Sequence, residues 1–276
     1  MFRWTSGLRR TPKEAPASTG GRAVYAVGDV HGCADLLAEL VDTILEDREK
    51  ARFPEQPALV FIGDYVDRGE DSRGVIDQVM ELQRSGWFEV RALKGNHEET
   101  MLAFLEDPAV GPAWADFGGL ATLASYGVSP PTRRSDAEAW AQARDALGKA
   151  LPRDHLDFFS RLELTAGFGD YYFVHAGVRP GIPLEEQKEH DLLWIREDFL
   201  RSRAPLPKVI VYGHTPAPDP QLGPRRIGID TGAYATGVLT AVRLRDAERE
   251  VFQARGGRAT GEASQLGEAS GVVTSS

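Results

Sequence analysis

The sequence predicts an α/β protein built from layers of strands and helices. Three short apolar runs each end in glycine and polar residues, and each leads into a stretch with apolar residues at helical spacing. In the second half of the chain, further apolar runs of strand length follow one another. Alternating strands and helices, followed by many short strands, indicate a layered fold around one core.

The three strand-loop-helix units are bounded by their apolar residues. Strands are expected at residues 23–27, 58–62 and 89–93, and the helices that follow them at residues 34–50, at residues 72–83 and up to about residue 107. Parallel strands joined by helices end at the same edge of a sheet, which is where open α/β folds bind their ligands. The loops after residues 27, 62 and 93 are therefore expected to form one site.

The rest of the chain divides into an insertion, a second set of strands and two tails. Residues 108–160 begin with a stretch rich in Gly and Pro, contain a helical pattern from 135 to 150, and are predicted to cap the same sheet edge. The later strands are expected at residues 162–165, 171–174, 209–212, 226–229, 238–243 and 250–253. Residues 1–21 and 255–276 are poor in apolar residues, so we expect a disordered leader and a disordered tail around one catalytic domain at 22–254.

Composition narrows the function classes. The formal charge of -9 speaks against nucleic acid or a membrane surface as a partner, because both are polyanionic. No apolar run approaches the roughly 20 residues that cross a bilayer, and the N-terminus has no secretory pattern. The single cysteine, Cys33, excludes an internal disulfide. We expect a cytoplasmic protein, and its oligomeric state stays open.

Polar side chains follow the predicted strands directly. They are Asp29 and His31, Asp64 and Asp67, Asn96 and His97, His175, and His214. This set offers oxygen and nitrogen ligands that suit hard or borderline divalent metals, and it contains no thiolate. The two carboxylate oxygens of Asp64 could bridge two ions in the geometry used for phosphoryl chemistry.

Each of these residues also has a structural interpretation. Asp29, Asp64 and Asn96, taken singly, are typical caps of turns or helices. Three histidines in the same kind of position make a shared site the better interpretation. His155 and His190 have no strand end before them and are left out of the site. Tyr234 is a candidate for the substrate pocket, with a structural role as the alternative.

Five motifs in order carry a family resemblance: GDVHG, GDYVDRG, GNHE, HAG and GHTP, between residues 28 and 216. They resemble those of the calcineurin-like metallophosphoesterases. The form GDYVDRG is similar to the motif of the bacterial serine/threonine phosphoprotein phosphatase branch. The resemblance implies a fold of the α+β four-layer type, with a β-sandwich of two mixed sheets flanked by helices.

The resemblance also implies roles for the candidate residues. The first metal would be held by Asp29, His31 and Asp64, and the second by Asp64, Asn96, His175 and His214. His97 would be the general acid, oriented by Asp67, and Arg68 would bind phosphate. Arg196 is the best match for a second phosphate-binding arginine, ahead of Arg179. Asn96 and Tyr234 complete the expected substrate contacts.

The expected activity is hydrolysis of phosphomonoesters, above all phosphoserine and phosphothreonine in proteins, by a hydroxide that bridges two divalent metal ions. Manganese is favoured, and iron, zinc or nickel also suit the ligands. The alternatives are a symmetrical bis(5'-nucleosyl)-tetraphosphatase or another small-molecule phosphoesterase, and, from another class, a non-catalytic phosphate-binding scaffold. The segment FGGLATLASYG, residues 117–127, resembles a segment of bacterial relatives; close packing and substrate contact both stay open for it.

Overall fold

The structure, a computed structural model, describes residues 17–256 and contains two five-stranded mixed sheets. The first sheet has the order β10-β9-β1-β2-β3, with bounds Glu248–Arg255, Val238–Arg245, Val24–Val27, Ala58–Phe61 and Glu89–Ala92. The second has the order β4-β5-β6-β8-β7, with bounds Thr165–Phe168, Tyr171–Val174, Val209–Tyr212, Arg226–Gly228 and Gln221–Leu222. Strands β1, β2 and β3 are parallel, as are β5, β6 and β8.

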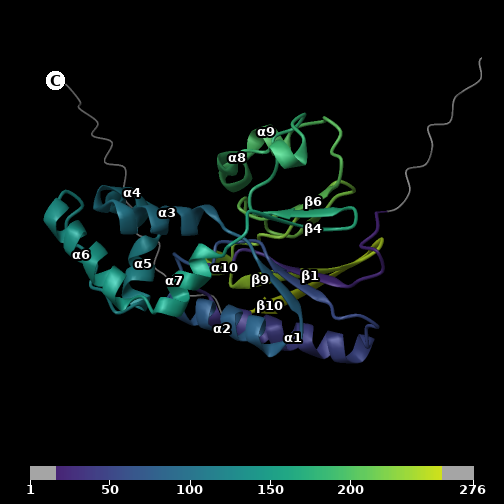
Figure 1. Cartoon of the computed structure of the whole chain (residues 1–276), viewed down its shortest axis with the longest axis horizontal. Coiled ribbons are helices and arrows are strands. Elements are labelled where there is room, and N and C mark those ends of the chain that lie inside the picture. The colour runs from purple at the N-terminus through teal and green to yellow at the C-terminus, as the bar shows by residue number, and fades with distance from the viewer. Residues whose placement is uncertain (1–16, 257–276) are drawn as a thin grey trace, which may run out of the picture.

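Helices cover the outer face of each sheet, which gives four layers (Figure 1). Helices α1 (Ala34–Ala51) and α2 (Ser72–Ser85) lie below the first sheet in this view, and α8 (Glu189–Trp194) and α9 (Glu197–Leu200) lie above the second. The predicted fold class, a sandwich of two mixed sheets flanked by helices, is confirmed. No helix in the part of the chain that the structure describes is long and apolar enough to cross a membrane.

The alternation of side chains along strands explains the layers. On β1, Tyr25 and Val27 pack into the core cluster between the first sheet and helices α1 and α2, while Val24 and Ala26 face the second sheet. On the second sheet, Phe173 packs toward the first sheet and Val174 packs with the residues of α8 and α9. Both faces of each sheet are therefore buried, which is why these strands appear in the sequence as continuous apolar runs.

The insertion forms a helical lobe beside the sheets (Figure 1). After α3 (Asn96–Glu106) come η1 (Pro108–Val110), α4 (Gly111–Asp116), α5 (Gly119–Ser125), α6 (Ala137–Ala150) and α7 (Arg153–Ser160). The remaining short elements are η2 (Leu184–Glu186) and α10 (Ala233–Thr236). Trp114 and Phe104 pack together in the lobe with ring centroids 4.9 Å apart, and both belong to the same core cluster, which extends from the first sheet into the lobe.

Several predicted boundaries were wrong. The strand expected at 162–165 lies at Thr165–Phe168 instead, because Glu163 forms only an isolated bridge to Leu93, whereas Ala166 and Phe168 bury side chains between the sheets. Strand β7 and helices α8 and α9 were not predicted. Residues 17–21 were placed in the leader, yet Ser18 donates its backbone N–H to Asp170. The rest of the predicted leader, and the predicted tail beyond residue 256, lie outside the described residues.

Candidate active site

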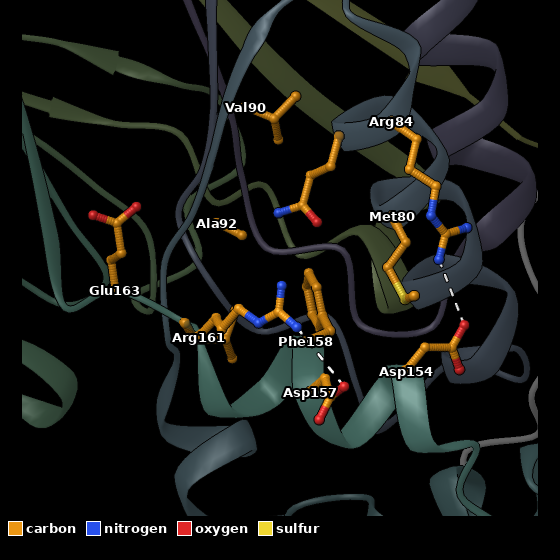
Figure 2. Close-up of a pocket in the computed structure, with 11 residues that line it drawn as sticks. Met80, Arg84, Val90, Ala92, Asp154, Asp157, Phe158, Arg161 and Glu163 are labelled. Atoms are coloured by element: carbon orange, nitrogen blue, oxygen red, sulfur yellow. Dashed lines mark hydrogen bonds and ion pairs between the residues drawn. The ribbon is translucent and has the colours of Figure 1, made fainter.

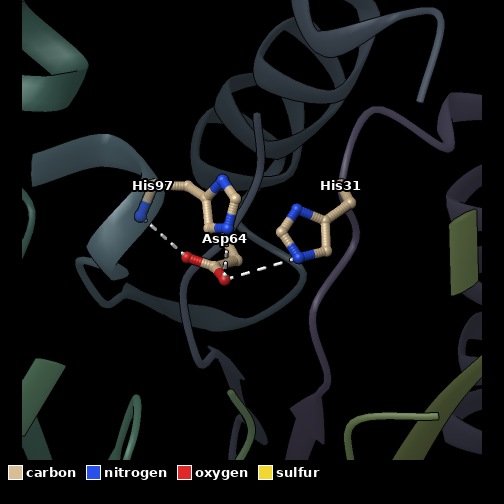
Figure 3. Close-up of side chains that lie close together, drawn as sticks. All are labelled: His31, Asp64 and His97. Carbon is tan, nitrogen blue, oxygen red and sulfur yellow. Dashed lines mark hydrogen bonds and ion pairs between the residues drawn. The ribbon is translucent and has the colours of Figure 1, made fainter. Parts of the chain in front are cut away.

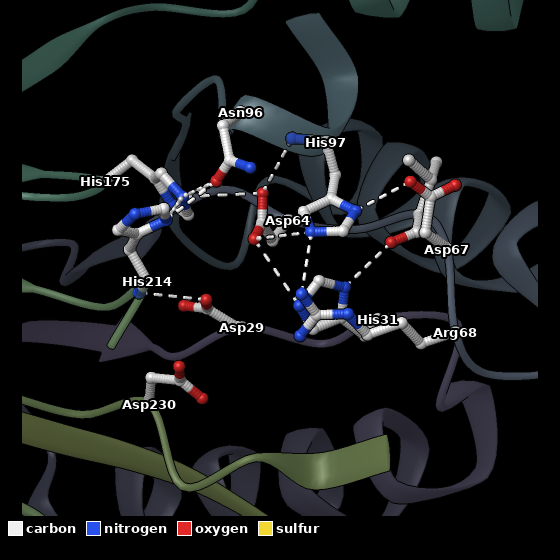
Figure 4. A network of polar contacts seen from close by, with 12 residues as sticks. Asp29, His31, Asp64, Asp67, Arg68, Asn96, His97, His175, His214 and Asp230 are labelled. Atoms are coloured by element: carbon white, nitrogen blue, oxygen red, sulfur yellow. Dashed lines mark hydrogen bonds and ion pairs between the residues drawn. The ribbon is translucent and has the colours of Figure 1, made fainter. Parts of the chain in front are cut away.

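Six loops meet at the carboxyl ends of the parallel strands of both sheets. They follow β1, β2, β3, β5, β6 and β8. Polar contacts link residues from the first five of these loops, and Asp230 from the loop after β8 lies beside them (Figure 4). The two sheets are joined directly there, since the backbone N–H of His214 donates to Oδ2 of Asp29 at 2.9 Å. The residues predicted to hold metal therefore come from both halves of the chain and lie together.

The first group of possible metal ligands contains His31, Asp64 and His97, all buried (Figure 3). Nε2 of His31 lies 3.4 Å from Oδ2 of Asp64, and Nε2 of His97 lies 3.8 Å from the same oxygen. The other nitrogen of His31, Nδ1, lies 2.9 Å from the carbonyl of Val66. A carbonyl oxygen only accepts, so Nδ1 must carry the ring proton. Nε2 then has a lone pair, which faces the carboxylate of Asp64.

The second group contains Asp64, His175 and His214, with Asn96 beside them. Nε2 of His175 lies 3.5 Å from Oδ1 of Asp64 and 2.9 Å from Oδ1 of Asn96. Nδ1 of His214 lies 2.8 Å from that same amide oxygen. Asp64 belongs to both groups through its two oxygens, as a bridging carboxylate must.

The donor atoms of both groups fit a cation. Nδ1 of His175 donates to the carbonyl of Ile62 at 2.9 Å, so its Nε2 lone pair faces the carboxylate of Asp64 with no proton between them. Oδ1 of Asp29 and Nε2 of His214 are buried and have no hydrogen-bond partner among the described residues. Converging acceptors without protons are costly to bury, and a bound cation satisfies them.

Burial and the local charges both favour a bound cation at this site. Burial lowers the pKa of His31 to about 3 and that of His214 to about 2, so both rings are neutral, the form that binds metal. Burial and the nearby charges of Asp230 and Asp64 raise the pKa of Asp29 well above its usual range. The crowding of carboxylates is therefore unfavourable without positive charge beside it.

The site is also where unusual backbone conformations collect. Of the seven described non-glycine residues with positive φ, five belong to the motif loops: His31, Asp64, Asp67, Arg68 and His214. Each such residue costs of order 1–3 kcal/mol and persists only where neighbours hold it in place. A Cβ on Gly95 would lie 2.1 Å from Oδ1 of Asp64, so only glycine allows the loop after β3 to come this close to the carboxylate.

His97, Asp67 and Arg68 form a bonded row beside the metal candidates. Nδ1 of His97 lies 2.7 Å from Oδ2 of Asp67, and Nε2 lies 3.0 Å from Arg68. Burial opposes the charged form of His97, but the carboxylates of Asp64 and Asp67 outweigh it and raise its pKa. Because a guanidinium can only donate, Arg68 gives an N–H to Nε2 here, and the ring proton lies on Nδ1, toward Asp67. Nε2 also lies 3.8 Å from Asp64, within reach of a shared metal ion.

The remaining predicted site residues differ in how close they lie to the possible metal ligands. Tyr234 lies against the site, 4.6 Å from Arg68 and 5.4 Å from the ring of His31. Arg196 is exposed at the start of α9. Burial is the main cause of the lowered pKa values of His175 and His214, and the positive charge of Arg196 contributes to them. Arg179 is held in ion pairs with Asp191 and Asp198. The structure therefore favours Arg196 over Arg179 for phosphate contact.

Two buried carboxylates at the site were missed. Asp230 follows β8 as the predicted aspartates follow their strands, is 5% exposed, and has a pKa raised to about 6 by burial and by Asp64. Glu98, the last residue of GNHE, is fully buried and accepts the backbone N–H groups of four residues at 2.8–3.2 Å: Asp64, Tyr65, Val66 and Gly95. Its position three residues after Gly95, where glutamate often caps a helix, was the available signal.

Glu98→Gln is expected to lower the free energy of unfolding by at least about 1–3 kcal/mol, because an amide NH₂ would replace one of the two accepting oxygens. Urea unfolding of the metal-free protein measures this loss. Glu106→Gln, at an exposed position of the same helix, is the matched control and should change little. Equal stability of the two variants would contradict the role given to Glu98.

A surface pocket of about 440 Å³ lies away from the motif loops, between α2, β3 and α7 (Figure 2). Its arginines are engaged, Arg84 with Asp154 and Arg161 with Asp157. None of the predicted site residues lines it. We assign no chemistry to this pocket.

Comparison with known proteins places the chain among phosphoesterases. A family model described as calcineurin-like phosphoesterase matches residues 23–244. Serine/threonine-protein phosphatase 1 of Salmonella typhimurium is 30% identical over 228 residues, which cover 81% of this chain and 92% of the relative.

Other relatives carry different names. The asymmetrical bis(5'-nucleosyl)-tetraphosphatase PrpE of Halalkalibacterium halodurans is 27% identical, covering 80% of this chain and 90% of the relative. A symmetrical bis(5'-nucleosyl)-tetraphosphatase of Acidovorax sp. is 32% identical, but the match covers 59% of this chain and only 47% of that relative. A solved structure described as a candidate diadenosine tetraphosphatase has a TM-score of 0.60 at 19% identity, covering 88% of this chain and 100% of that one, which supports the fold alone.

Proposed function

This chain belongs to the calcineurin-like phosphoesterase family, and we propose that it is a metal-dependent phosphatase whose main substrates are phosphoserine and phosphothreonine in proteins. The observation that carries the proposal is the convergence of two groups of metal-binding atoms on Asp64, beside the bonded pair of His97 and Asp67. A phosphatase needs these two parts next to each other: cationic charge for the phosphate and a proton for the leaving oxygen.

Six side chains would hold two divalent ions: Asp29, His31, Asp64, Asn96, His175 and His214. Such ions, manganese by preference and otherwise iron, zinc or nickel, lower the pKa of water near a phosphate and neutralise the charge on its oxygens. The fit rests on the unpartnered atoms of Asp29 and His214 and on the lone pairs that face Asp64.

The protein's own groups divide the remaining work. Arg68 and Arg196 bind the phosphate oxygens, and the planar fork of arginine suits two of them at once. Once Arg68 has turned from Nε2 of His97 to the phosphate, Nε2 carries a proton and gives it to the leaving oxygen, while Asp67 holds Nδ1 and fixes the ring. Asn96 and Tyr234 line the substrate side, where the ring of Tyr234 supports the guanidinium of Arg68.

A dinucleoside tetraphosphatase is the second candidate. The relative named PrpE aligns with 80% of this chain and with 90% of its own length, almost as fully as the phosphatase from Salmonella. Rings of Phe117 and Trp194, whose centroids lie 5.9 Å apart, stand beside His97 and His214 and offer flat apolar surface near the leaving group. For both candidate functions we expect a phosphorylated substrate in the cytoplasm. Nucleic acid and membranes are not expected as partners.

The choice between these substrates has a direct test. With manganese present, kcat/KM is expected to be higher for a phosphoserine peptide than for diadenosine tetraphosphate by a factor of about ten or more, which corresponds to about 1.4 kcal/mol. Excess chelator should abolish both activities. Faster cleavage of the tetraphosphate by orders of magnitude would replace the protein-phosphatase assignment, and full activity in chelator would refute the metal requirement.

A further inference from the structure

The insertion reaches the bonded pair of His97 and Asp67 through two side chains. Nε1 of Trp114, from α4, donates to both oxygens of Asp67 at 2.9 and 3.1 Å. Oγ1 of Thr122, from α5, donates to Oδ1 of Asp67 at 2.6 Å and accepts the backbone N–H of Asp67 at 2.8 Å. Asp67, Trp114 and Thr122 are all 0% exposed.

These contacts hold a conformation that Asp67 would not adopt alone. Its φ is +74°, in the left-handed region that is costly for a residue other than glycine. Ser72 adds a second acceptor for its backbone N–H at 3.1 Å. With both oxygens bonded, the carboxylate has one orientation, and in it Oδ2 lies 2.7 Å from Nδ1 of His97.

The two glycines of FGGLATLASYG explain how the segment comes so close. Gly118 has φ of +100°, its carbonyl accepts the backbone N–H of Arg68 at 3.2 Å, and a Cβ there would lie 2.8 Å from that nitrogen. A Cβ on Gly119 would lie 2.3 Å from the ring of Trp114. The same short segment therefore packs against Arg68 and supports the tryptophan that holds Asp67.

We propose that Trp114 and Thr122 are positioning residues, which lock the Asp67 carboxylate so that His97 meets the leaving oxygen of the substrate. The proposal rests on the proposed function, because His97 has a leaving oxygen to protonate only in a phosphoesterase. For the segment 117–127, whose role the sequence leaves open, it assigns Gly118, Gly119 and Thr122 to the alignment of the proton donor. Through Trp114 and Thr122 the insertion thereby takes part in aligning the proton donor.

Trp114→Phe removes the indole N–H and keeps an aromatic ring against Phe104. Its matched control is Trp140→Phe, since Trp140 is another buried tryptophan of the insertion, 3% exposed, whose Nε1 donates to the carbonyl of Arg134 instead. Thr122→Val is the second variant; it keeps the shape of the side chain and removes only the hydroxyl, so it can be measured if Trp114→Phe does not fold.

The first measurement is the dependence of turnover on the leaving group. A misplaced proton donor slows esters of alcohols, whose leaving oxygen needs a proton, far more than 4-nitrophenyl phosphate, whose leaving group departs without one. We expect Trp114→Phe to lower kcat about tenfold or more on phosphoserine peptide and less than about twofold on 4-nitrophenyl phosphate, within the range that general acid catalysis supplies. KM should change little, and Trp140→Phe should match the wild type on both substrates.

The second measurement needs no activity. In zinc-loaded protein, the Nδ1 proton of His97 bonded to Asp67 should give a downfield NMR signal that is absent in His97→Asn. Trp114→Phe or Thr122→Val should shift or broaden it, and Trp140→Phe should not. An unchanged signal in both test variants, or an equal loss on both phosphate esters, would overturn the positioning role. If the wild type cleaves neither ester, the proposed function is refuted. A shifted signal in the variants would then show only that Trp114 and Thr122 orient Asp67 and His97.

Discussion

The His97→Asn variant is expected to lose about 10²–10⁴-fold in kcat on a phosphoserine peptide, the range typical of a removed general acid. Asparagine cannot give up a proton near neutral pH, although it retains a polar group toward Asp67. The number of bound manganese ions should stay at two, because the six proposed ligands are unchanged. Steady-state kinetics and metal analysis of the same preparation check both statements.

This variant also separates the two possible roles of His97. Its Nε2 lies 3.8 Å from Oδ2 of Asp64, close enough for it to be counted with His31 and Asp64 as a possible metal group. If His97 were a ligand, the substitution would release an ion. His155→Asn is the matched control, since that histidine is also buried but bonds Asp77 and Tyr126 away from the site. Undiminished turnover would remove His97 from its role.

The Asp64→Asn variant, unlike His97→Asn, is expected to bind metal poorly. Asp64 is the one residue common to both groups of metal-binding atoms, and asparagine would replace a charged oxygen by a neutral NH₂. Loss of an outer partner of a metal ligand already weakens binding about 10–100-fold, so loss of a shared ligand should exceed about 100-fold and abolish activity at micromolar manganese. Calorimetric titration of manganese into the chelator-treated variant measures the affinity.

Asp42→Asn, at an exposed position of α1, is the matched control and should bind manganese as the wild type does. Retention of two tightly bound ions by Asp64→Asn would refute the bridge. Weak binding by both variants would point to a general loss of charge rather than to the loss of a ligand.

Much of the fold could be predicted because its signals are local. Strands β5 and β6 have the predicted bounds, since each is a buried apolar run closed by a polar motif. The first three loops also meet as expected, because parallel strands joined by helices end at one edge. Strand β4 was misplaced because Gly167 interrupts its apolar pattern, and its burial between the sheets depends on distant partners.

The parts of the site that could not be predicted depend on contacts between distant segments. Nothing near His214 in the sequence indicates that its backbone bonds Asp29 across the two sheets. Likewise, nothing in the sequence distinguishes Trp114 and Thr122 from ordinary core residues. Only the folding of the insertion brings them to Asp67. Glu98 and Asp230 were the exceptions, because the first stands at a capping position and the second directly follows a strand.

The substrate is not fixed by these residues. In the proposed function, the metal candidates, His97 and Arg68 would all act on the phosphate and on the oxygen that leaves it, which phosphoproteins and dinucleoside polyphosphates share. We expect the substrates to be distinguished farther out, at Phe117 and Trp194, which come from the insertion and from α8. Substrate comparison therefore tests a different part of the molecule from the variants of the central site.

Anomalous diffraction from crystals grown with manganese is the most direct test of the dimetal centre. Two peaks are expected on either side of Asp64, one beside Asp29 and His31 and the other beside Asn96, His175 and His214. A fully active protein whose crystals show no manganese at Asp64, or manganese only at other residues, would contradict the account.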